Sequence, residues 1–187
     1  MNQIKEKYKR IIKDEQQNYK EWMFPSLGRC IMASIKSEPA YKIMKWQVAS
    51  RWADYYDEMR VTSSNPWYKL MYILYSRKRN RLGLHVGNEL LTTNIGEGLL
   101  VYHGRNVINT YAKIGKNLHL HGCNVIGNAG PDTPTDCPTI GDNVMLGAGA
   151  KVIGKITIAD NVKIAAGAVV VKSCLVGGGL MLEYQLI

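Results

Sequence analysis

The sequence lacks a hydrophobic run long enough to cross a bilayer, because its apolar stretch Trp67–Tyr75 falls far short of the roughly 20 residues that a membrane helix needs. Its first residues are polar and charged, which is unlike a secretory signal peptide. Its four cysteines form no CxxC pair and show no disulfide-framework spacing, so we expect reduced thiols. These absences favour a cytoplasmic protein that is soluble or peripheral to a membrane. The cysteines are Cys30, Cys123, Cys137 and Cys174.

Acidic residues are scarce in the first part of the chain. Residues 1–81 contain 17 Lys and Arg against 8 Asp and Glu, whereas residues 82–187 contain 7 of each. A cationic surface favours an anionic partner such as a membrane, a nucleic acid or an acidic glycan. No nucleic-acid-binding module is visible, and most of these charges alternate with acidic residues as in solvated helices, so no nucleic-acid partner is expected. Peripheral association of this basic region with the inner face of a membrane is kept as a hypothesis.

Residues 1–82 are expected to form an α-helical region, with breaks at Phe24-Pro25-Ser26, at Pro39 and at residues 63–66, and with Gly83 at its end. The last of these helices, over residues 67–81, is rich in aromatic residues and ends in basic ones. Packing of its apolar face on the first coil of the following domain is the favoured interpretation. Contact with an anionic membrane surface is the alternative.

Residues 83–187 carry a six-residue repeat that is clearest from Thr139 to Cys174. Each hexad has a large aliphatic residue at its second position and an apolar residue three positions later. This period does not fit a helix, but it fits a coil with three flat faces, in which each hexad forms one short strand. The sequence therefore predicts a mainly β domain after an α-helical N-terminal part. The aliphatic residues expected to point inward are Ile108, Ile114, Leu120, Ile126, Ile140, Leu146, Val152, Ile158, Ile164 and Val170.

The repeat is interrupted at residues 102–105 and by an excursion over residues 127–138. Loops that interrupt a solenoid commonly carry its functional site. His103 lies at the first interruption, where a neutral imidazole could take a proton from an alcohol. The alternative is a surface histidine in a turn.

Two further chemistries are weaker predictions. His119 and His121 form an HxH pair that should point away from the core and could chelate zinc, but no third histidine has clear ligand spacing, so no metal is expected. Cys137 follows an acidic residue in the excursion and could act as a nucleophile. It has no base nearby in the sequence, so an incidental thiol is favoured.

Three stretches, residues 95–104, 112–117 and 138–151, make the C-terminal half resemble the hexapeptide-repeat acyltransferases, and within them the branch of serine acetyltransferases and capsular polysaccharide O-acetyltransferases. The resemblance implies a left-handed parallel β-helix, a homotrimer, and acetyl-CoA as a cosubstrate in the groove between adjacent copies. It also implies that His103, at the end of an IGxGLxxxH motif, is the general base for direct transfer of the acetyl group to an acceptor hydroxyl.

The same resemblance implies further site residues. An acidic residue shortly before the first coil usually orients the catalytic histidine, and Glu89 is the first choice for it here, with Asn88 second. Small residues would let the pantetheine arm of coenzyme A approach the main chain. Two lysines would meet its phosphates, unless they are only solvated residues at a corner of the coil. These cofactor-binding residues are Gly147, Ala148, Ala166, Gly167, Lys151 and Lys172.

The acceptor side departs from the serine acetyltransferase pattern, because Tyr102 stands where the family has an acid and Asp136-Cys137 stand where it has an Arg-His pair. An aromatic residue beside the base suits a sugar ring. The favoured function is therefore O-acetylation of a sugar hydroxyl in capsule, O-antigen or exopolysaccharide biosynthesis. The alternatives are serine O-acetylation in cysteine biosynthesis and a catalytically silent β-helix with a structural or binding role. Residues 176–187 also lack the turn that usually closes the family's coenzyme A site. The residues expected to bind the acceptor are Tyr102, Arg105, His121 and Asp136.

Overall fold

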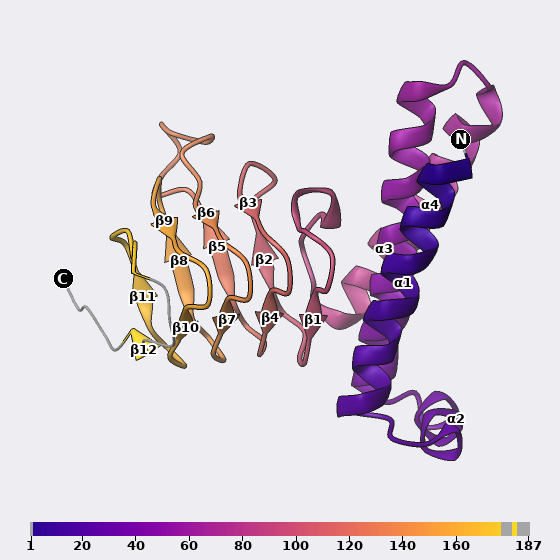
Figure 1. Ribbon diagram of the computed structural model, residues 1–187, viewed down its shortest axis with the longest axis horizontal. Helices are drawn as coiled ribbons and strands as arrows, with labels where there is room; N and C mark the ends of the chain where they lie inside the picture. Colours follow the sequence, from indigo (N-terminus) through magenta and orange to yellow (C-terminus); the bar gives the residue numbers. More distant parts are fainter. Residues whose placement is uncertain (1, 177–180, 183–187) are drawn as a thin grey trace. The chain divides into compact units, whose positions relative to one another are not determined.

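The computed structural model describes residues 2–176 and 181–182. It contains two compact units, the helical Met1–Val86 and the β-helical Gly87–Ile187 (Figure 1). The boundary between the units follows Val86, a few residues beyond the one expected at residues 82–83. Most of the C-terminal segment that departs from the family's closing turn lies outside the described residues.

The helices of the first unit are α1 (Asn2–Trp22), α2 (Leu27–Ile35), α3 (Pro39–Thr62) and α4 (Pro66–Val86). The breaks between them fall where the sequence predicts. Ser26 caps α2, since its hydroxyl accepts a hydrogen bond from the Arg29 N–H at 3.2 Å. Pro39 is the first residue of α3. Proline is tolerated there because the N–H group that it lacks would have no partner within the helix. The expected end of α4 at Gly83 is wrong: the helix continues to Val86 and ends at Gly87, which has φ +70°.

A buried polar network holds α1 against α3. Arg51 Nη2 donates a hydrogen bond to Glu15 Oε1 at 2.6 Å, and Gln47 Nε2 donates to Glu15 Oε2 at 2.8 Å. The Tyr19 hydroxyl donates to Gln47 Oε1 at 2.9 Å. All four side chains are buried. Because a buried charge without a partner is costly, this network specifies how the two helices pair.

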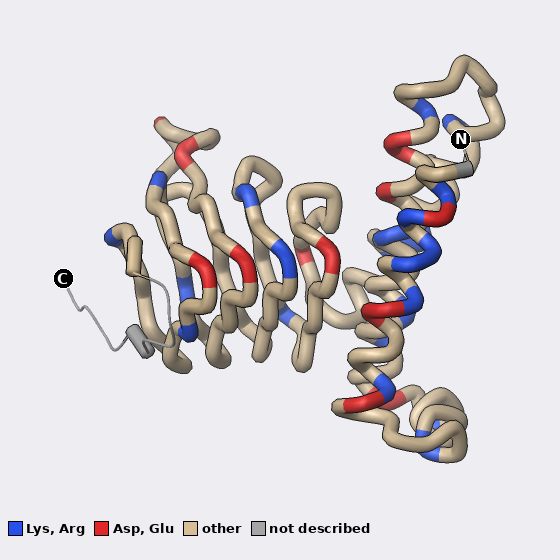
Figure 2. The backbone as a smooth tube through the Cα atoms, in the orientation of Figure 1, with Lys and Arg blue, Asp and Glu red and all other residues tan. Residues whose placement is uncertain are grey.

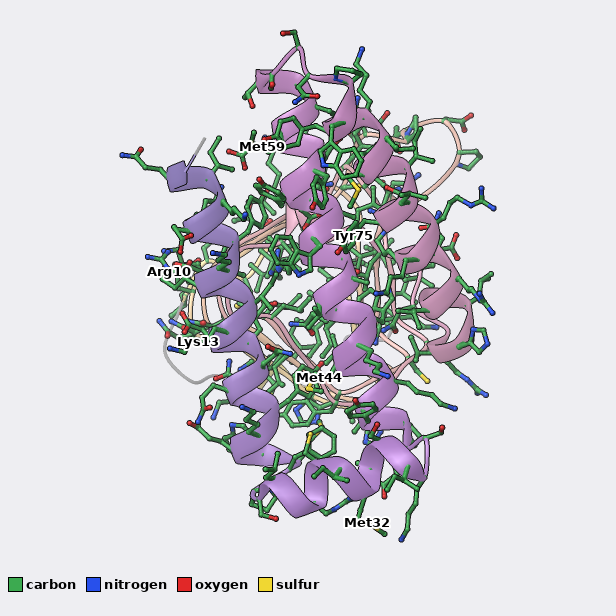
Figure 3. The ribbon with its side chains drawn as sticks, turned by 90° about the vertical axis from the view of Figure 1, so that its right-hand side faces the viewer. Arg10, Lys13, Met32, Met44, Met59 and Tyr75 are labelled. Carbon is green, nitrogen blue, oxygen red and sulfur yellow. The ribbon has the colours of Figure 1, made fainter. Side chains whose placement is uncertain are left out.

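Apolar side chains fill much of the space between the helices, and most basic ones lie on their outer surfaces, with the buried Arg51 as an exception. Met44 and Met59 are buried, whereas Arg10 and Lys13 are exposed (Figure 3). Lysine and arginine occur along the length of the helices (Figure 2). This distribution gives the first unit the cationic surface that its composition predicts.

The apolar stripe of α4 is not buried within the helical unit. Trp67, Leu70, Ile73 and Leu74 are each about half exposed. The helix contains no acidic residue. No helix in the described part of the chain is long and apolar enough to cross a membrane. Association of this surface with an anionic membrane stays a prediction.

The second unit is a three-sided coil of short parallel strands (Figure 1). Its three sheets have the orders β1-β4-β7-β10-β12, β2-β5-β8-β11 and β3-β6-β9. Strands on successive coils pair in register, for example Lys113 with Thr139 and Thr139 with Thr157. The predicted parallel β-helix is therefore confirmed. After a 3-10 turn over Thr92–Asn94, the strands are β1 (Leu100–Val101), β2 (Val107–Ile108), β3 (Lys113–Ile114), β4 (His119–Leu120), β5 (Val125–Gly127), β6 (Thr139–Ile140), β7 (Met145–Leu146), β8 (Lys151–Ile153), β9 (Thr157–Ile158), β10 (Lys163–Ile164), β11 (Val169–Val170) and β12 (Met181–Leu182).

The predicted aliphatic residues fill the interior of the coil. From Ile108 to Ile164 all of them are at most 7% exposed, and only Val170, on the last full strand of the series, is partly exposed. His119 and His121 are partly exposed on either side of the buried Leu120, as expected. The hexad pattern therefore assigns the inward and outward faces correctly.

Asparagines form the turns at the corner that leads from β3, β6 and β9 into the next strand. Asn117, Asn143 and Asn161 have φ values of +55°, +56° and +61°, a left-handed conformation that asparagine tolerates. Their side chains also bond from coil to coil: Asn117 Nδ2 donates to Asn143 Oδ1 at 2.8 Å, and Asn143 Nδ2 donates to Asn161 Oδ1 at 3.1 Å. These bonds fix the stacking of successive coils.

Candidate functional site

His103 lies at a second corner of the coil, which we call the His103 corner. Here the chain turns from the sheet of β1, β4, β7 and β10 into the sheet of β2, β5, β8 and β11. The corner consists of residues 102–106, 121–124, 147–150 and 165–168 on successive coils. His103 is exposed, so its ring is accessible from outside.

A ladder of buried asparagine amides holds this corner from the inside. Asn106 Nδ2 donates to the carbonyl oxygen of His103 at 2.8 Å and to Asn88 Oδ1 at 3.0 Å. The Asn124 N–H donates to Asn106 Oδ1 at 3.2 Å, and Asn124 Oδ1 accepts from the Gly122 N–H at 3.0 Å. The three amides thus join the turn of His103 to the coils on either side.

Gly122 lies directly against His103. A Cβ atom at this position would be 2.6 Å from the Cβ of His103 and 3.3 Å from the carbonyl oxygen of Gly104. Gly122 also has φ +111°, a conformation that residues with a side chain rarely adopt. The placement of His103 on the preceding coil therefore requires glycine at position 122.

Aromatic and imidazole rings line the corner beside His103. The rings of Tyr102 and His121 are stacked with centroids 4.5 Å apart, and the ring of His119 lies 6.0 Å from that of Tyr102. Burial lowers the pKa of both His119 and His121. The neighbouring His121 also lowers the pKa of His119, and His103 lowers that of His121, each by a smaller amount. Burial also raises the pKa of the Tyr102 hydroxyl. These shifts favour the uncharged form of all three rings.

The expected partners of His103 occupy other positions in the described structure. Asn88 is buried, and its Oδ1 accepts both the N–H and Nδ2–H of Asn106, so it acts on the turn rather than on the His103 ring. Glu89 is exposed and pairs through its backbone with Val107, at the start of the next face. Within residues 2–176 neither side chain bonds to the His103 ring, and an orienting role for Glu89 stays a prediction.

The small residues expected to line the coenzyme A site lie on the His103 corner. A Cβ atom on Gly147 would be 2.5 Å from the backbone nitrogen of Ala166, and the Gly167 N–H donates to the Ala148 carbonyl oxygen at 2.8 Å. Lys151 is exposed at the start of β8, next to this corner. Lys172 is exposed after β11, at the far end of that face. His103 and the small residues therefore share one continuous edge of the coil.

The excursion lies at the third corner, between β5 and β6, and not at the His103 corner. Asp136 forms an ion pair with Lys155 at 3.5 Å. Cys137 is buried, and burial, assisted by Asp136, raises the pKa of its thiol. A raised pKa disfavours the thiolate that a nucleophile needs. The structure thus separates the two interruptions of the repeat within one chain.

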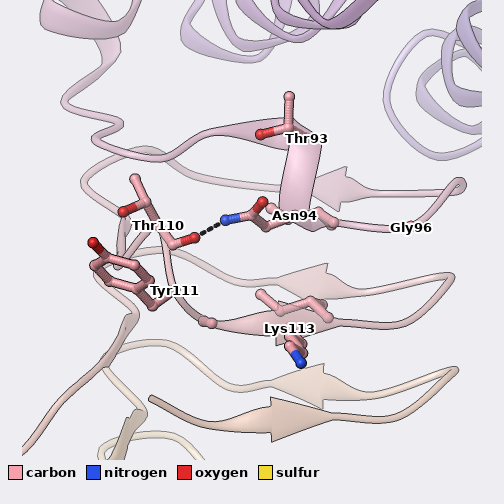
Figure 4. Close-up of a pocket in the computed structure, with 9 residues that line it drawn as sticks. Thr93, Asn94, Gly96, Thr110, Tyr111 and Lys113 are labelled. Carbon is pink, nitrogen blue, oxygen red and sulfur yellow. Dashed lines mark hydrogen bonds between the residues drawn. The ribbon is translucent and has the colours of Figure 1, made fainter. Parts of the chain in front are cut away.

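Cavities occur away from the His103 corner. One of about 430 Å³ lies along the first coils near the third corner, where Asn94 donates a hydrogen bond to the carbonyl oxygen of Thr110 (Figure 4). Another, of about 410 Å³, lies between α1 and α2. No group of three metal-ligating side chains occurs within the described ranges, where the HxH pair packs with Tyr102 instead. The first cavity is lined by residues 93–96 and 110–114.

Sequence reasoning missed the residues that hold His103, namely Asn106, Asn124 and Gly122. A signal for the first two is present in the sequence. Asn88, Asn106 and Asn124 follow one another at intervals of 18 residues, which is the length of one coil here. Each of the first two bonds to the next one along the chain. Polar residues that recur once per coil are expected to stack on one another.

Comparisons with known proteins agree with this fold. Residues 137–172 match the family described as bacterial transferase hexapeptide (six repeats). The serine acetyltransferase of Staphylococcus xylosus is 42% identical over 64 residues, which are 34% of this chain and 30% of that protein. A serine acetyltransferase of Synechocystis is 42% identical over 63 residues, which are 33% of this chain and 25% of that protein. Residues 137–172 of the β-helix thus match the hexapeptide-transferase family model, and the resemblance to the serine acetyltransferase branch is confirmed.

Solved serine acetyltransferases share the fold. The soybean enzyme complexed with serine has a TM-score of 0.64 at 19% identity, over 90% of this chain and 64% of that one. Isoform 3 of Entamoeba histolytica, in complex with cysteine, has a TM-score of 0.63 at 21% identity, over 97% of this chain and 60% of that one. The chain therefore spans less than two thirds of these proteins, and at such identities the likeness concerns the fold alone.

The favoured acceptor, a sugar hydroxyl in polysaccharide biosynthesis, is wrong. The relatives by sequence and the structural neighbours are serine acetyltransferases, and the soybean structure contains serine. The argument for a sugar depended on Tyr102 beside the base. The structure shows one face of this ring stacked on His121, so that face is not open to a sugar.

Proposed function

We propose that the protein is an acetyl-CoA-dependent O-acetyltransferase and that serine is its acceptor. The observation that carries the proposal is the placement of His103 at the edge of the coil that also holds the small residues Gly147, Ala148, Ala166 and Gly167. The identity of the matched segments to serine acetyltransferases supports the choice of serine.

The proposed mechanism is direct transfer with His103 as general base. The imidazole takes the proton from the serine hydroxyl as its oxygen attacks the carbonyl carbon of the thioester. The new C–O bond forms, the C–S bond breaks, and the departing sulfur receives the proton that His103 holds. No covalent enzyme intermediate is needed, because binding both substrates at one edge supplies proximity.

The residues at this edge fit the cosubstrate. Gly147 and Ala166, on successive coils, lie so close together that a side chain on Gly147 would not fit. The main chain at this edge is therefore open to a narrow ligand such as the pantetheine arm. Lys151, next to the corner, is the first candidate to meet a phosphate, and Lys172 is the second.

The proposed site is completed by further copies of the chain in a homotrimer. Within one chain the excursion with Asp136 and the turn with His103 lie at different corners of the coil. If three copies of the three-sided coil associate side by side around an axis, one corner of each copy lies next to a different corner of its neighbour. This arrangement accounts for two interruptions of the repeat that never meet in one chain.

The test is release of free coenzyme A from acetyl-CoA in the presence of L-serine. We expect His103→Ala to lower kcat by about 10²–10⁴-fold, the usual contribution of a general base. His85→Ala is the matched control, because His85 is exposed on α4 and its ring bonds to the nearby Arg81 carbonyl oxygen. Unchanged kcat in His103→Ala would remove the assigned base. Coenzyme A binding without transfer by the unaltered protein would favour the catalytically silent alternative.

A further inference from the structure

The wall beside His103 has no acidic member. It is formed by Tyr102, His119 and His121. The ring centroid of Tyr102 lies 4.5 Å from that of His121 and 6.0 Å from that of His119. Among the described residues, the neighbours that shift the pKa of the two imidazoles are themselves histidines, and no carboxylate contributes. A ligand bound against this wall therefore meets uncharged rings.

An ammonium group gains little from such a wall. A carboxylate would bind it through a charge-assisted hydrogen bond, which is the strong way to hold a cation. The face of an aromatic ring also attracts a cation, but His121 already covers one face of Tyr102. Asp136, which a neighbouring copy would bring to this corner in the proposed trimer, is paired with Lys155 at 3.5 Å. The acceptor amine is therefore expected to remain in solvent.

For a carboxylate, in contrast, the same turn offers Arg105 as a candidate partner. Arg105 follows His103 by two residues, is exposed, and forms no ion pair with any described acidic residue. Its φ of +65° and its packing against Gly87, where a Cβ atom would lie 3.0 Å from the Arg105 Cγ, fix the start of its side chain. Arginine is well suited to a carboxylate because it can donate two parallel hydrogen bonds.

From this geometry we infer that the site recognises the hydroxyl and the carboxylate of its acceptor but not the amino group. Its substrate class is then small 3-hydroxy acids in general, with serine as one member. This inference rests on the proposed function. It assigns specificity to the neutral Tyr102–His121 stack and to Arg105.

The experiment compares three acceptors that differ by one group: L-serine, 3-hydroxypropanoate, which lacks the amine, and ethanolamine, which lacks the carboxylate. We expect kcat/KM for 3-hydroxypropanoate to lie within about threefold of that for serine. Ethanolamine should be poorer by about tenfold to a hundredfold, since a hydrogen bond to a charged group has that effect on a rate constant. Arg105→Gln should lower the values for both acids and leave that for ethanolamine unchanged.

Two substitutions at Tyr102 test the wall itself. Tyr102→Asp puts a carboxylate beside the acceptor and should raise the preference for serine over 3-hydroxypropanoate to about tenfold or more. Tyr102→Phe keeps the stacked ring and should leave the preference unchanged. A more than tenfold preference of the unaltered protein for serine would overturn the inference and indicate that another group, from His121 or from a second copy, binds the amine. Absence of transfer to both acids is a different result, which overturns the proposed function.

Discussion

Replacement of Gly122 by alanine tests whether the backbone beneath His103 controls catalysis. The added Cβ would lie 2.6 Å from the His103 Cβ, whereas unbonded carbon atoms prefer separations of about 3.5–4.0 Å. One of the two coils must therefore move by about 1 Å. A displacement of that size at a reacting group can lower a rate by about 10²-fold.

The substitution also has a cost in stability. Gly122 has φ +111°, and a residue with a side chain held in such a conformation costs about 1–3 kcal/mol. We expect Gly122→Ala to lower kcat with acetyl-CoA and serine by about 10²-fold, and to lower the free energy of unfolding by about 1–3 kcal/mol. Binding of coenzyme A, measured by calorimetry, should persist, because Gly147 and Ala166 lie on later coils.

Gly28→Ala is the matched control. Gly28 is in α2, outside the proposed site, and a Cβ atom there would meet nothing within 4 Å. It should leave kcat unchanged and should not lower stability. If Gly122→Ala keeps full kcat while its stability falls, the position of His103 does not limit the reaction, and the reasoning from Gly122 to catalysis is refuted.

Two further predictions concern stability. Arg51→Met leaves Glu15 as a buried charge without its main partner and should lower the free energy of unfolding in urea by about 3–5 kcal/mol. The double variant Glu15→Met/Arg51→Met should lose less of this free energy. Equal losses in the two variants would contradict the pairing. The pKa values of His119 and His121 are lowered chiefly by burial, so the unfolded chain binds more protons than the folded one as pH falls below the ordinary value of 6.5. The thermal midpoint should therefore fall as pH drops below that value, and His119→Gln/His121→Gln should reduce the fall; an identical pH dependence in both proteins would show that these imidazoles are not responsible.

The sequence predicts the β-helix well because its period is a direct consequence of the geometry. A coil with three faces places every sixth residue in the same environment, and the inward positions from Ile108 to Ile164 are all buried. The end of the last helix was less predictable. Gly83 lowers helix propensity, but tertiary packing buries it within α4, and the chain leaves the helix only at Gly87.

The candidate site was predictable in part. The interruption of the repeat indicated His103, and small residues indicated the edge of the coil beside it. Periodicity along the chain does not reveal which interruptions share a corner, so the excursion with Asp136 was expected at the site although it lies at another corner. The partner of His103 was less predictable. Asn88, the second choice, bonds to Asn106 instead, and Glu89, the first choice, stays a prediction.

The His103 corner combines an open outer surface with a strongly bonded interior. On the outside, Ala148, Ala166 and Gly167 are exposed and carry little or no side chain, which gives a ligand access to the main chain but removes side-chain packing. On the inside, the amides of Asn106 and Asn124 supply the contacts that packing does not. A satisfied buried hydrogen bond contributes only about 1 kcal/mol, but an unmade one costs about 1–3 kcal/mol, so removal of the amide of Asn106 or Asn124 costs more than its own bonds contribute. The turn of His103 can therefore be held in place without any side chain between His103 and the ligands proposed for this edge.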